Sequence, residues 1–243
     1  MKTFYFTATG NSLYVAKRIG GEIYSIPQML KEGKREFEDE AIGFIFPCYG
    51  FGLPRIVTDF IQKSNFKAKY FFAIMTYGNM AASGLKHMEE IGSKAGIQFN
   101  YTDELLMIDN YLPLFKMEDQ LKKESSKQIE KNLEQIKKGF LKDMVSKPIH
   151  NLSAKFHQDD GDTRFTVHDN CNTCKVCEQV CPVSNIKVGT KPEFLHSCES
   201  CYACTHHCPQ NAIHLKAERS TARFINQNVQ LKEIIAANNQ SNA

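Results

Sequence analysis

The first half of the chain alternates between short apolar runs and amphipathic stretches. Three runs, Lys2–Thr7, Ala41–Cys48 and Lys69–Thr76, are rich in aromatic and β-branched residues, which is typical of buried strands. We place two further strands within Glu22–Met29 and within Phe99–Ile108. The pattern therefore predicts five strands in this half.

Amphipathic stretches separate these strands and predict helices over about Asn11–Ile23, Pro54–Gln62 and Ala81–Ala95. Strands and helices in alternation predict a parallel sheet with right-handed crossovers. Apolar residues at helical spacing then continue from Leu121 to Met144, which predicts one long closing helix. The expected fold class of this half is α/β, with a doubly wound parallel sheet.

The periodic pattern stops around Ser146–Gly161, where Pro148 and a short acidic run precede a different kind of sequence. The end of the chain shows one short helical pattern, at Val229–Ile235, before a polar terminus. We divide the chain into a first domain at 1–147, a linker at 148–165, a second domain at 166–217 and a tail at 218–243.

The composition is that of a globular protein. Hydrophobic residues make up 42% and charged residues 23% of the chain, and no apolar run approaches the ~20 residues that span a bilayer. Lysines and arginines exceed acids by 30 − 27 = 3, a surplus too weak to indicate nucleic acid as a partner. Because the first strand begins almost at Met1, we expect no signal peptide and a cytoplasmic location.

The cysteines are unevenly distributed. Of the nine, eight lie between Cys171 and Cys208, and only Cys48 lies outside that segment. Disulfides would require export to an oxidising compartment. The clustering therefore predicts bound metal in a reducing compartment.

The cysteine-rich segment contains an internal repeat with a period of 27 residues. Each copy has four cysteines separated by two, two and three residues and followed by proline, the run found in bacterial ferredoxins. The offset also pairs the apolar residues Ile186 and Ile213. The two runs are Cys171, Cys174, Cys177, Cys181, Pro182 and Cys198, Cys201, Cys204, Cys208, Pro209.

On these motifs, residues 166–217 resemble the two-cluster bacterial ferredoxins. The resemblance implies a small α+β domain with two [4Fe–4S] clusters, in which the fourth cysteine of each run binds the cluster of the other run. It implies one cluster on Cys171, Cys174, Cys177 and Cys208, and the other on Cys198, Cys201, Cys204 and Cys181.

This segment has two other possible interpretations. Structural zinc is the alternative metal, but zinc sites usually pair two CxxC elements and need no third close cysteine. His206 and His207 lie between two cysteines of the second run. Because the thiolates already complete both sites, we interpret these histidines as solvated neighbours and not as ligands.

Hydroxyl-bearing residues cluster directly after the first predicted strand. In an open parallel sheet, ligands bind beyond the carboxyl ends of the strands. Hydroxyls, a glycine and the first amides of a helix together favour a phosphate group. A helix cap, the alternative, needs only one such residue. The candidate phosphate loop consists of Thr7, Ala8, Thr9, Gly10, Asn11 and Ser12.

Two further loops follow predicted strands and place an aromatic residue beside a glycine, which suits the binding of a flat ring. With the phosphate loop, they resemble the flavodoxin family over residues 1–147. The resemblance implies the strand order 2-1-3-4-5 and FMN as the cofactor, since the GxGxxG of dinucleotide sites is absent. The candidate ring loops consist of Pro47, Tyr49, Gly50, Phe51 and Gly52, and of Thr76, Tyr77, Gly78 and Asn79.

Two features near the expected ring are less specific. The segment Asp109–Pro113 follows the last predicted strand and is a further candidate for approaching the ring. Cys48 lies within the first ring loop, and a lone cysteine of this kind is more often a small core residue than a redox partner. The chain also lacks the tryptophan that flanks the ring in many flavodoxins.

The whole chain resembles the flavodoxin–ferredoxin fusion proteins of anaerobic bacteria and archaea. The resemblance implies an electron carrier that passes electrons between two [4Fe–4S] clusters and FMN, and so links one-electron and two-electron redox partner proteins. Two alternatives stay open: an oxidoreductase that acts on a small substrate at the flavin, and a redox sensor. The sequence names neither the donor nor the acceptor, and leaves a homodimer open.

Overall fold

The computed structural model describes residues 1–123, 130–131, 133–134 and 161–238. Contacts divide the chain into two compact units, each discontinuous in sequence. The predicted helix from Leu121 to Met144 and the predicted linker at 148–165 lie largely outside the described residues. In its described part, unit 1 consists of Met1–Thr7, Asn11–Met107 and residues 130–134 without 132, and unit 2 consists of Ala8–Gly10, residues 108–123 and residues 161–238.

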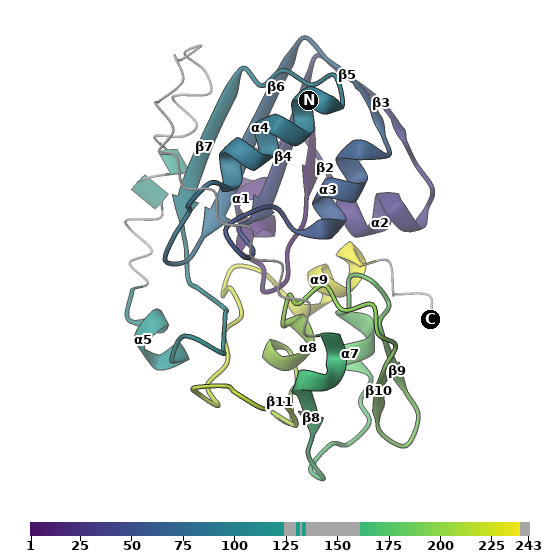
Figure 1. Cartoon of the computed structure of the whole chain (residues 1–243), viewed down its shortest axis with the longest axis vertical. Coiled ribbons are helices and arrows are strands. Elements are labelled where there is room, and N and C mark those ends of the chain that lie inside the picture. Colours follow the sequence, from purple (N-terminus) through teal and green to yellow (C-terminus); the bar gives the residue numbers. More distant parts are fainter. Residues whose placement is uncertain (124–129, 132, 135–160, 239–243) are drawn as a thin grey trace. The chain divides into compact units, whose positions relative to one another are not determined.

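Unit 1 is built on a five-stranded sheet in which every neighbouring pair is parallel. The strand order is β2-β1-β4-β6-β7 (Figure 1), which is the flavodoxin-like order 2-1-3-4-5 when these five strands are numbered along the chain. The predicted fold class is confirmed by this order. The strands are β1 (Lys2–Tyr5), β2 (Glu22–Ser25), β4 (Ala41–Pro47), β6 (Tyr70–Tyr77) and β7 (Tyr101–Leu106).

Helices cover both faces of this sheet. Helices α2 (Ile26–Lys31), α3 (Arg55–Gln62) and α4 (Gly84–Lys94) pack side by side, and Figure 1 shows α3 and α4 in front of the strands. Helix α1 (Asn11–Ile19) packs on β4 from behind. Its Arg18 forms an ion pair with Glu130 at 2.7 Å and a hydrogen bond with Glu134, so these two glutamates lie along the same face.

The second strand is shorter than the sequence predicts. The prediction placed it within Glu22–Met29, but the strand ends at Ser25 and α2 begins at Ile26. The Ser25 hydroxyl accepts the Gln28 amide at 3.5 Å, and Pro27 lies in the first turn. A serine cap and an early proline both favour a helix start, so these residues end the strand.

An aromatic cluster fills the core of unit 1. Phe4 and Phe44 come from the central strands and Phe60 from α3, and all three are fully buried. A separate two-stranded parallel sheet, β3 (Glu36–Glu38) with β5 (Asn65–Lys67), adds Phe37 and Phe66, whose rings stack at 5.4 Å. The small sheet therefore extends the core beyond the main sheet.

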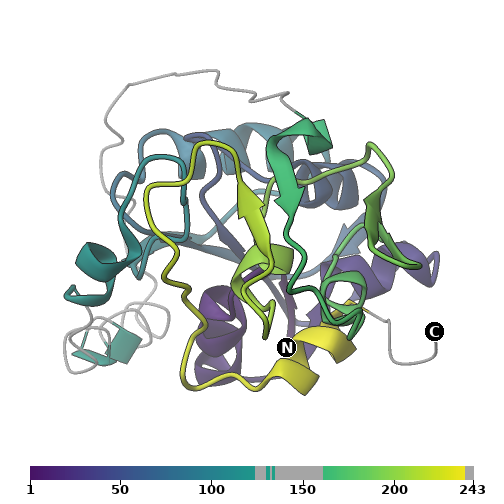
Figure 2. The same cartoon turned by 90° about the horizontal axis from the view of Figure 1, so that it is seen from below.

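Unit 2 contains the cysteine repeat, and its elements recur at the same 27-residue offset. Each half supplies two strands and a short helix, and each antiparallel pair joins a strand of one half to a strand of the other: β8 with β11 and β9 with β10. Figure 2 shows β8 and β11 as the adjacent green and yellow-green arrows. The first half contains β8 (Phe165–Val167), α7 (Val176–Gln179) and β9 (Ile186–Val188), and the second contains β10 (Pro192–Phe194), α8 (Ala203–His206) and β11 (Ile213–Leu215).

The core of unit 2 uses more of the chain than the predicted residues 166–217. Ile108, Leu112 and Met117 pack into it from the segment after β7, together with Phe224 from the tail. The remaining elements are α5 (Met117–Leu121), a 3₁₀ turn at Gly161–Arg164 and α9 (Leu231–Ala237), and the last confirms the short helix expected in the tail. Across the described part of the chain, no helix is long and apolar enough to cross a membrane.

Candidate cofactor sites

The candidate phosphate loop lies between β1 and α1. The side chains of Thr7, Thr9 and Ser12 are almost completely buried, and the first turn of α1 carries no acidic residue. Gly10 has φ +99°, a left-handed conformation that side chains rarely adopt. Hydroxyl groups next to an uncompensated helix N-terminus form an environment that favours an anion.

The phosphate loop and the second ring loop meet at their hydroxyl groups. Ser12, in the first turn of α1, forms a hydrogen bond of 2.9 Å with Thr76 near the end of β6. Both side chains are buried. Within unit 1 this bond brings together two of the loops that the sequence assigns to one cofactor.

The first ring loop, after β4, forms a tight turn. The backbone amides of Tyr49 and Gly52 each donate to the carbonyl of the other at 3.0 Å. The two residues between them have positive φ, +54° at Gly50 and +66° at Phe51. Positive φ at both central residues is typical of type I′ turns, which fix the direction of the chain closely.

Three hydrogen bonds hold the first ring loop to the segment that follows β6. The Leu53 amide donates to His87 Nδ1 at 3.3 Å, the Ser83 hydroxyl donates to the Phe51 carbonyl at 3.4 Å, and the Cys48 thiol donates to the Ala81 carbonyl at 3.6 Å. The sequence analysis did not single out Ser83 or His87. Both residues lie in the predicted helix Ala81–Ala95, and the helical pattern does not indicate which loop their side chains contact.

The second ring loop contains Tyr77, Gly78 and Asn79 directly after the buried Thr76. Tyr77 is half-buried, and burial raises the pKa of its phenol, with a smaller contribution from the carboxylates of Glu104 and Asp103. The phenol therefore stays protonated at neutral pH, able to donate a hydrogen bond.

The middle of the phosphate loop makes its contacts within unit 2. The Ala8 carbonyl lies 3.1 Å from His207 Nε2, and the Thr9 carbonyl accepts the Asn226 amide at 2.8 Å. The Thr9 hydroxyl accepts a hydrogen bond of 3.5 Å from the Asn110 side-chain amide. The carbonyls of residues 8 and 9 are thus both used in protein contacts.

The interpretation of His206 and His207 as solvated residues is wrong. Their side chains are 2% and 4% exposed. His206 Nε2 pairs with the Asn110 carbonyl at 2.9 Å, and its Nδ1 accepts the Phe224 amide at 3.1 Å. Burial lowers the pKa of His206 to about 4, so the ring is neutral at pH 7. These histidines connect the second cysteine run to the segments that complete the core of unit 2.

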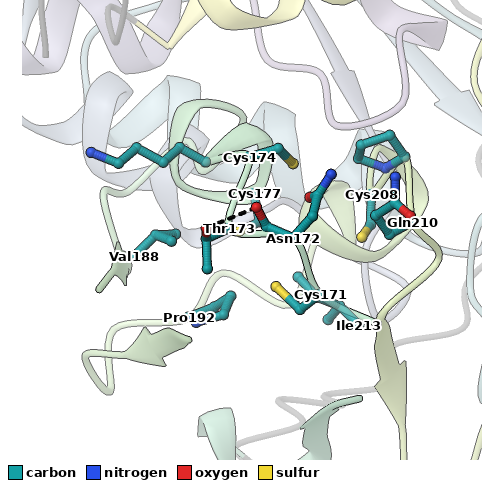
Figure 3. A pocket seen from close by; sticks show the side chains of 12 residues that line it. Cys171, Asn172, Thr173, Cys174, Cys177, Val188, Pro192, Cys208, Gln210 and Ile213 are labelled. Atoms are coloured by element: carbon teal, nitrogen blue, oxygen red, sulfur yellow. Dashed lines mark hydrogen bonds between the residues drawn. The ribbon is translucent and has the colours of Figure 1, made fainter. Parts of the chain in front are cut away.

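Four cysteines surround one pocket in unit 2. Cys171, Cys174 and Cys177 of the first run line it together with Cys208 of the second run (Figure 3). Ile213 is among the other residues that line this open pocket. The structure therefore groups three cysteines of one half with the last cysteine of the other.

The other four cysteines also form a group. Burial raises the pKa of Cys201 well above its usual value, and the neighbouring Cys181, Cys198 and Cys204 raise it further through charge repulsion. Burial likewise raises the pKa of Cys177 in the first group to about 12. Thiols in such surroundings keep their protons unless a strongly positive group displaces them.

The loops between the cysteines have the same backbone in both halves. Thr173 and Ser200 have φ of +56° and +58°, and Lys175 and Tyr202 have φ of +64° and +60°. Residues other than glycine rarely adopt these angles. Their recurrence at equivalent positions indicates that both cysteine loops have the same backbone conformation.

Backbone amides donate to the last cysteine sulfur of each run. The Asn185 amide lies 3.1 Å from Cys181 Sγ, and the Ala212 amide lies 3.2 Å from Cys208 Sγ, again 27 residues apart. Hydrogen bonds to sulfur stabilise the thiolate form and tune bound metal centres. No disulfide joins any of the nine cysteines, all of which lie in the described part of the chain.

Among the residues that the structure describes, no three histidine, cysteine, aspartate or glutamate side chains are placed to hold a metal ion. Structural zinc would need four ligands converging at about 2.1–2.3 Å from one ion. The first cysteine group lines a pocket.

Comparisons with known proteins add little to this description. No protein-family model and no curated protein matches the chain. The Trp repressor binding protein from Bacillus subtilis is 16% identical, with a TM-score of 0.36 over 56% of this chain and 95% of that one. An azoreductase from Bacillus anthracis is 11% identical, with a TM-score of 0.33 over 57% and 97%. Because these TM-scores are low, the assignment of the fold is based on the strand order alone.

Proposed function

We propose that this protein transfers electrons, with FMN bound in unit 1 and two [4Fe–4S] clusters bound in unit 2. The observation that supports the proposal most strongly is the pocket lined by Cys171, Cys174, Cys177 and Cys208. Three ligands from one run and the fourth from the other run are what the two-cluster ferredoxin motif requires.

In this proposal the FMN phosphate binds to the loop Thr7, Ala8, Thr9, Gly10, Asn11, Ser12. The buried hydroxyls of this loop and the first amides of α1 supply donors to an anion, and no carboxylate in the loop opposes it. The ring loops Pro47–Gly52 and Thr76–Asn79 contribute Tyr49, Phe51 and Tyr77 as aromatic partners for the isoalloxazine ring.

The cluster in the first group would be held by Cys171, Cys174, Cys177 and Cys208. The second would be held by Cys198, Cys201, Cys204 and Cys181. When bound, FMN exchanges one or two electrons and each cluster exchanges one. Backbone amides donate to the sulfurs of Cys181 and Cys208, and four of the eight cysteines are buried away from water.

Two other functions of the same sites remain as alternatives. An oxidoreductase would turn over a small substrate at the flavin, and a redox sensor would change its partner when a cluster is lost. A carrier is favoured because both copies of the repeat have all four cysteines. They would therefore provide two one-electron centres in addition to one flavin. Sustained turnover of a small substrate at the rate of flavin reduction would favour the oxidoreductase.

The test of the proposal is cofactor content after anaerobic reconstitution. The wild-type chain should bind about eight irons and eight sulfides, four of each per cluster, together with one FMN. Cys181→Ser should damage the cluster on Cys198–Cys204, while Cys208→Ser should damage the cluster on Cys171–Cys177.

Cys48→Ser is the matched control for these variants and should retain both clusters, since Cys48 lies in unit 1. Mössbauer or electron paramagnetic resonance spectra of the two serine variants identify which cluster is affected. Loss of the cluster nearest in sequence to the mutated cysteine would contradict the crossed ligation. Tight binding of zinc without iron would contradict the proposal as a whole.

A further inference from the structure

The repeat provides an internal comparison between the two cysteine groups. Any residue near one group has a counterpart 27 residues away near the other, and equal surroundings should give the two sites equal properties. One pair of counterparts consists of two cations in different surroundings: Arg164 before β8 corresponds to Lys191 before β10.

Arg164 lies directly on the loop that carries the second cysteine group. Its Nη1 donates to the Tyr202 hydroxyl at 3.2 Å, and its Nη2 donates to the Ser200 hydroxyl. The guanidinium carbon lies 5.5 Å from the centre of the Tyr202 ring. Ser200 and Tyr202 flank Cys201, so the Arg164 guanidinium is hydrogen-bonded to both neighbours of this cysteine.

The guanidinium is partly shielded from water, since Arg164 is half-buried. Its Nε is buried and has no hydrogen-bond partner among the described residues. An arginine side chain keeps its charge under all ordinary conditions. A permanent charge in a poorly solvated position acts on its neighbours more strongly than one in water.

The counterpart Lys191 lies in quite different surroundings. Its side chain is 53% exposed, and its ammonium pairs at 2.7 Å with Asp169, which is 99% exposed. Solvent and salt screen such a surface pair, whose net effect is usually small. The first cysteine group therefore has no equivalent of the shielded cation at Arg164.

One buried carboxylate opposes Arg164. Asp162 accepts the side-chain amide of Asn185 at 2.8 Å and the backbone amide of His196. The counterpart of Asp162 in the repeat is Gly189, so both fixed charges distinguish the second group from the first.

We propose that Arg164 is a positioning residue whose fixed charge raises the reduction potential of the cluster on Cys198, Cys201, Cys204 and Cys181. Reduction adds one electron, from a redox partner or an electrode, to a centre that is already negative, and no bond is made or broken. A nearby cation stabilises the added charge. This inference rests on the proposed function, since it requires that the second cluster is present.

The experiment is a potentiometric titration of the reconstituted full-length protein, followed by electron paramagnetic resonance. Arg164→Gln should lower the equilibrium constant for reduction of one cluster at least about tenfold, which corresponds to about 59 mV for a one-electron couple. The other cluster should change less than about twofold, or about 18 mV on the same scale. Arg164→Lys, which keeps the charge, should restore most of the lost potential.

Lys191→Gln is the matched control from the repeat. It removes a charge at the equivalent position and should shift neither cluster, because that charge is exposed to solvent. A shift of the first cluster by Lys191→Gln as large as the shift produced by Arg164→Gln would overturn the inference. So would an unchanged potential in Arg164→Gln protein that holds its full complement of iron.

Iron content separates the possible failures. Wild-type protein that takes up no iron contradicts the proposed function itself and not the role of Arg164. If Arg164→Gln alone loses iron, the charge argument is tested with Asp162→Asn, which removes the opposing charge and should raise the same potential. A lowered potential in Asp162→Asn would overturn the inference.

Discussion

The hydroxyls of Ser12 and Thr76 share a hydrogen bond of 2.9 Å although 64 residues separate them in the chain. Ser12 belongs to the first turn of α1, and Thr76 to the end of β6. Strand β4 lies between β1 and β6 in the sheet, so the bond spans the edge at which three parallel strands end. It gives the proposed FMN site a fixed connection between its phosphate and ring loops.

This connection leads to a prediction about the phosphate. Replacing Thr9 and Ser12 together by alanine should weaken FMN binding at least about 100-fold, since each charge-assisted hydrogen bond contributes roughly 1.5–3 kcal/mol. Riboflavin, which lacks the phosphate, should bind the variant almost as well as the wild type. Flavin fluorescence measures both affinities, and Ser93→Ala on the exposed side of α4 is the control.

Equal affinity of the unmodified protein for FMN and riboflavin would show that this loop does not hold phosphate. An equal loss of both flavins in the double variant would instead assign the two hydroxyls to the structure of the loop. The comparison therefore separates a contact with phosphate from a general effect on folding.

The turn at Tyr49–Gly52 should depend on the glycine at its first central position. Gly50→Val forces a β-branched residue into φ near +54° and should lower the free energy of unfolding by about 1–2 kcal/mol. Gly50→Asn should lose much less, because asparagine tolerates this region. Urea unfolding followed by far-ultraviolet circular dichroism measures the difference, and equal losses in the two variants would argue against backbone strain.

Asn185 is a buried polar residue whose side chain holds two segments of unit 2 together. Its side-chain amide donates to Asp162 at 2.8 Å, and its side-chain oxygen accepts the Ser197 amide at 2.6 Å. Asn185→Ala leaves the buried Asp162 without this donor and should cost about 1–3 kcal/mol, whereas Ser197 is exposed and its amide can bind water instead.

The counterpart of Asn185 in the repeat is Ala212, so the substitution makes the two halves more alike while lowering stability. Asn170→Ala, at an exposed position, should change the free energy of unfolding by less than about 0.5 kcal/mol. Denaturant titration of the reconstituted protein tests both expectations. If Asn185→Ala is as stable as the wild type, water must replace both lost hydrogen bonds.

Removal of iron should change which thiols react. With clusters bound, iodoacetamide should modify only Cys48 of the nine cysteines. After chelation under native conditions, the exposed Cys174 should react first. Cys201 and Cys204 should react last, because burial raises the pKa of their thiols well above the usual value. Peptide mass spectrometry gives the order, and uniform modification before chelation would contradict cluster binding.

Strands β1, β4 and β6 could be predicted from the sequence because they are short apolar runs whose residues are mostly buried. Strand β7 is more polar and partly exposed, and in β2 only four residues precede the helix that Ser25 caps. The small sheet of β3 and β5 was missed because three residues with one buried aromatic do not form a recognisable pattern. Periodicity identifies long amphipathic elements better than short ones.

The cysteine groups could be predicted because ligand spacing is local, whereas their surroundings depend on packing between distant segments. Nothing in the local sequence identifies Arg164 or the burial of His206, which contacts Asn110 and Phe224. One indication was nevertheless available. Aligning the repeat on itself pairs Arg164 with Lys191 and Asn185 with Ala212. The residue type at these positions differs between the two halves.

The pairing of β8 with β11 and of β9 with β10 also has a consequence for biosynthesis. A chain that has emerged from the ribosome only as far as β9 already displays the first three cysteines of the first pocket, but Cys208 has not yet emerged. Strand β8 at that stage lacks its partner β11 as well. For the proposed function this means that insertion of the first cluster requires nearly the whole repeat, and we expect both clusters to be inserted after translation of the two halves is complete.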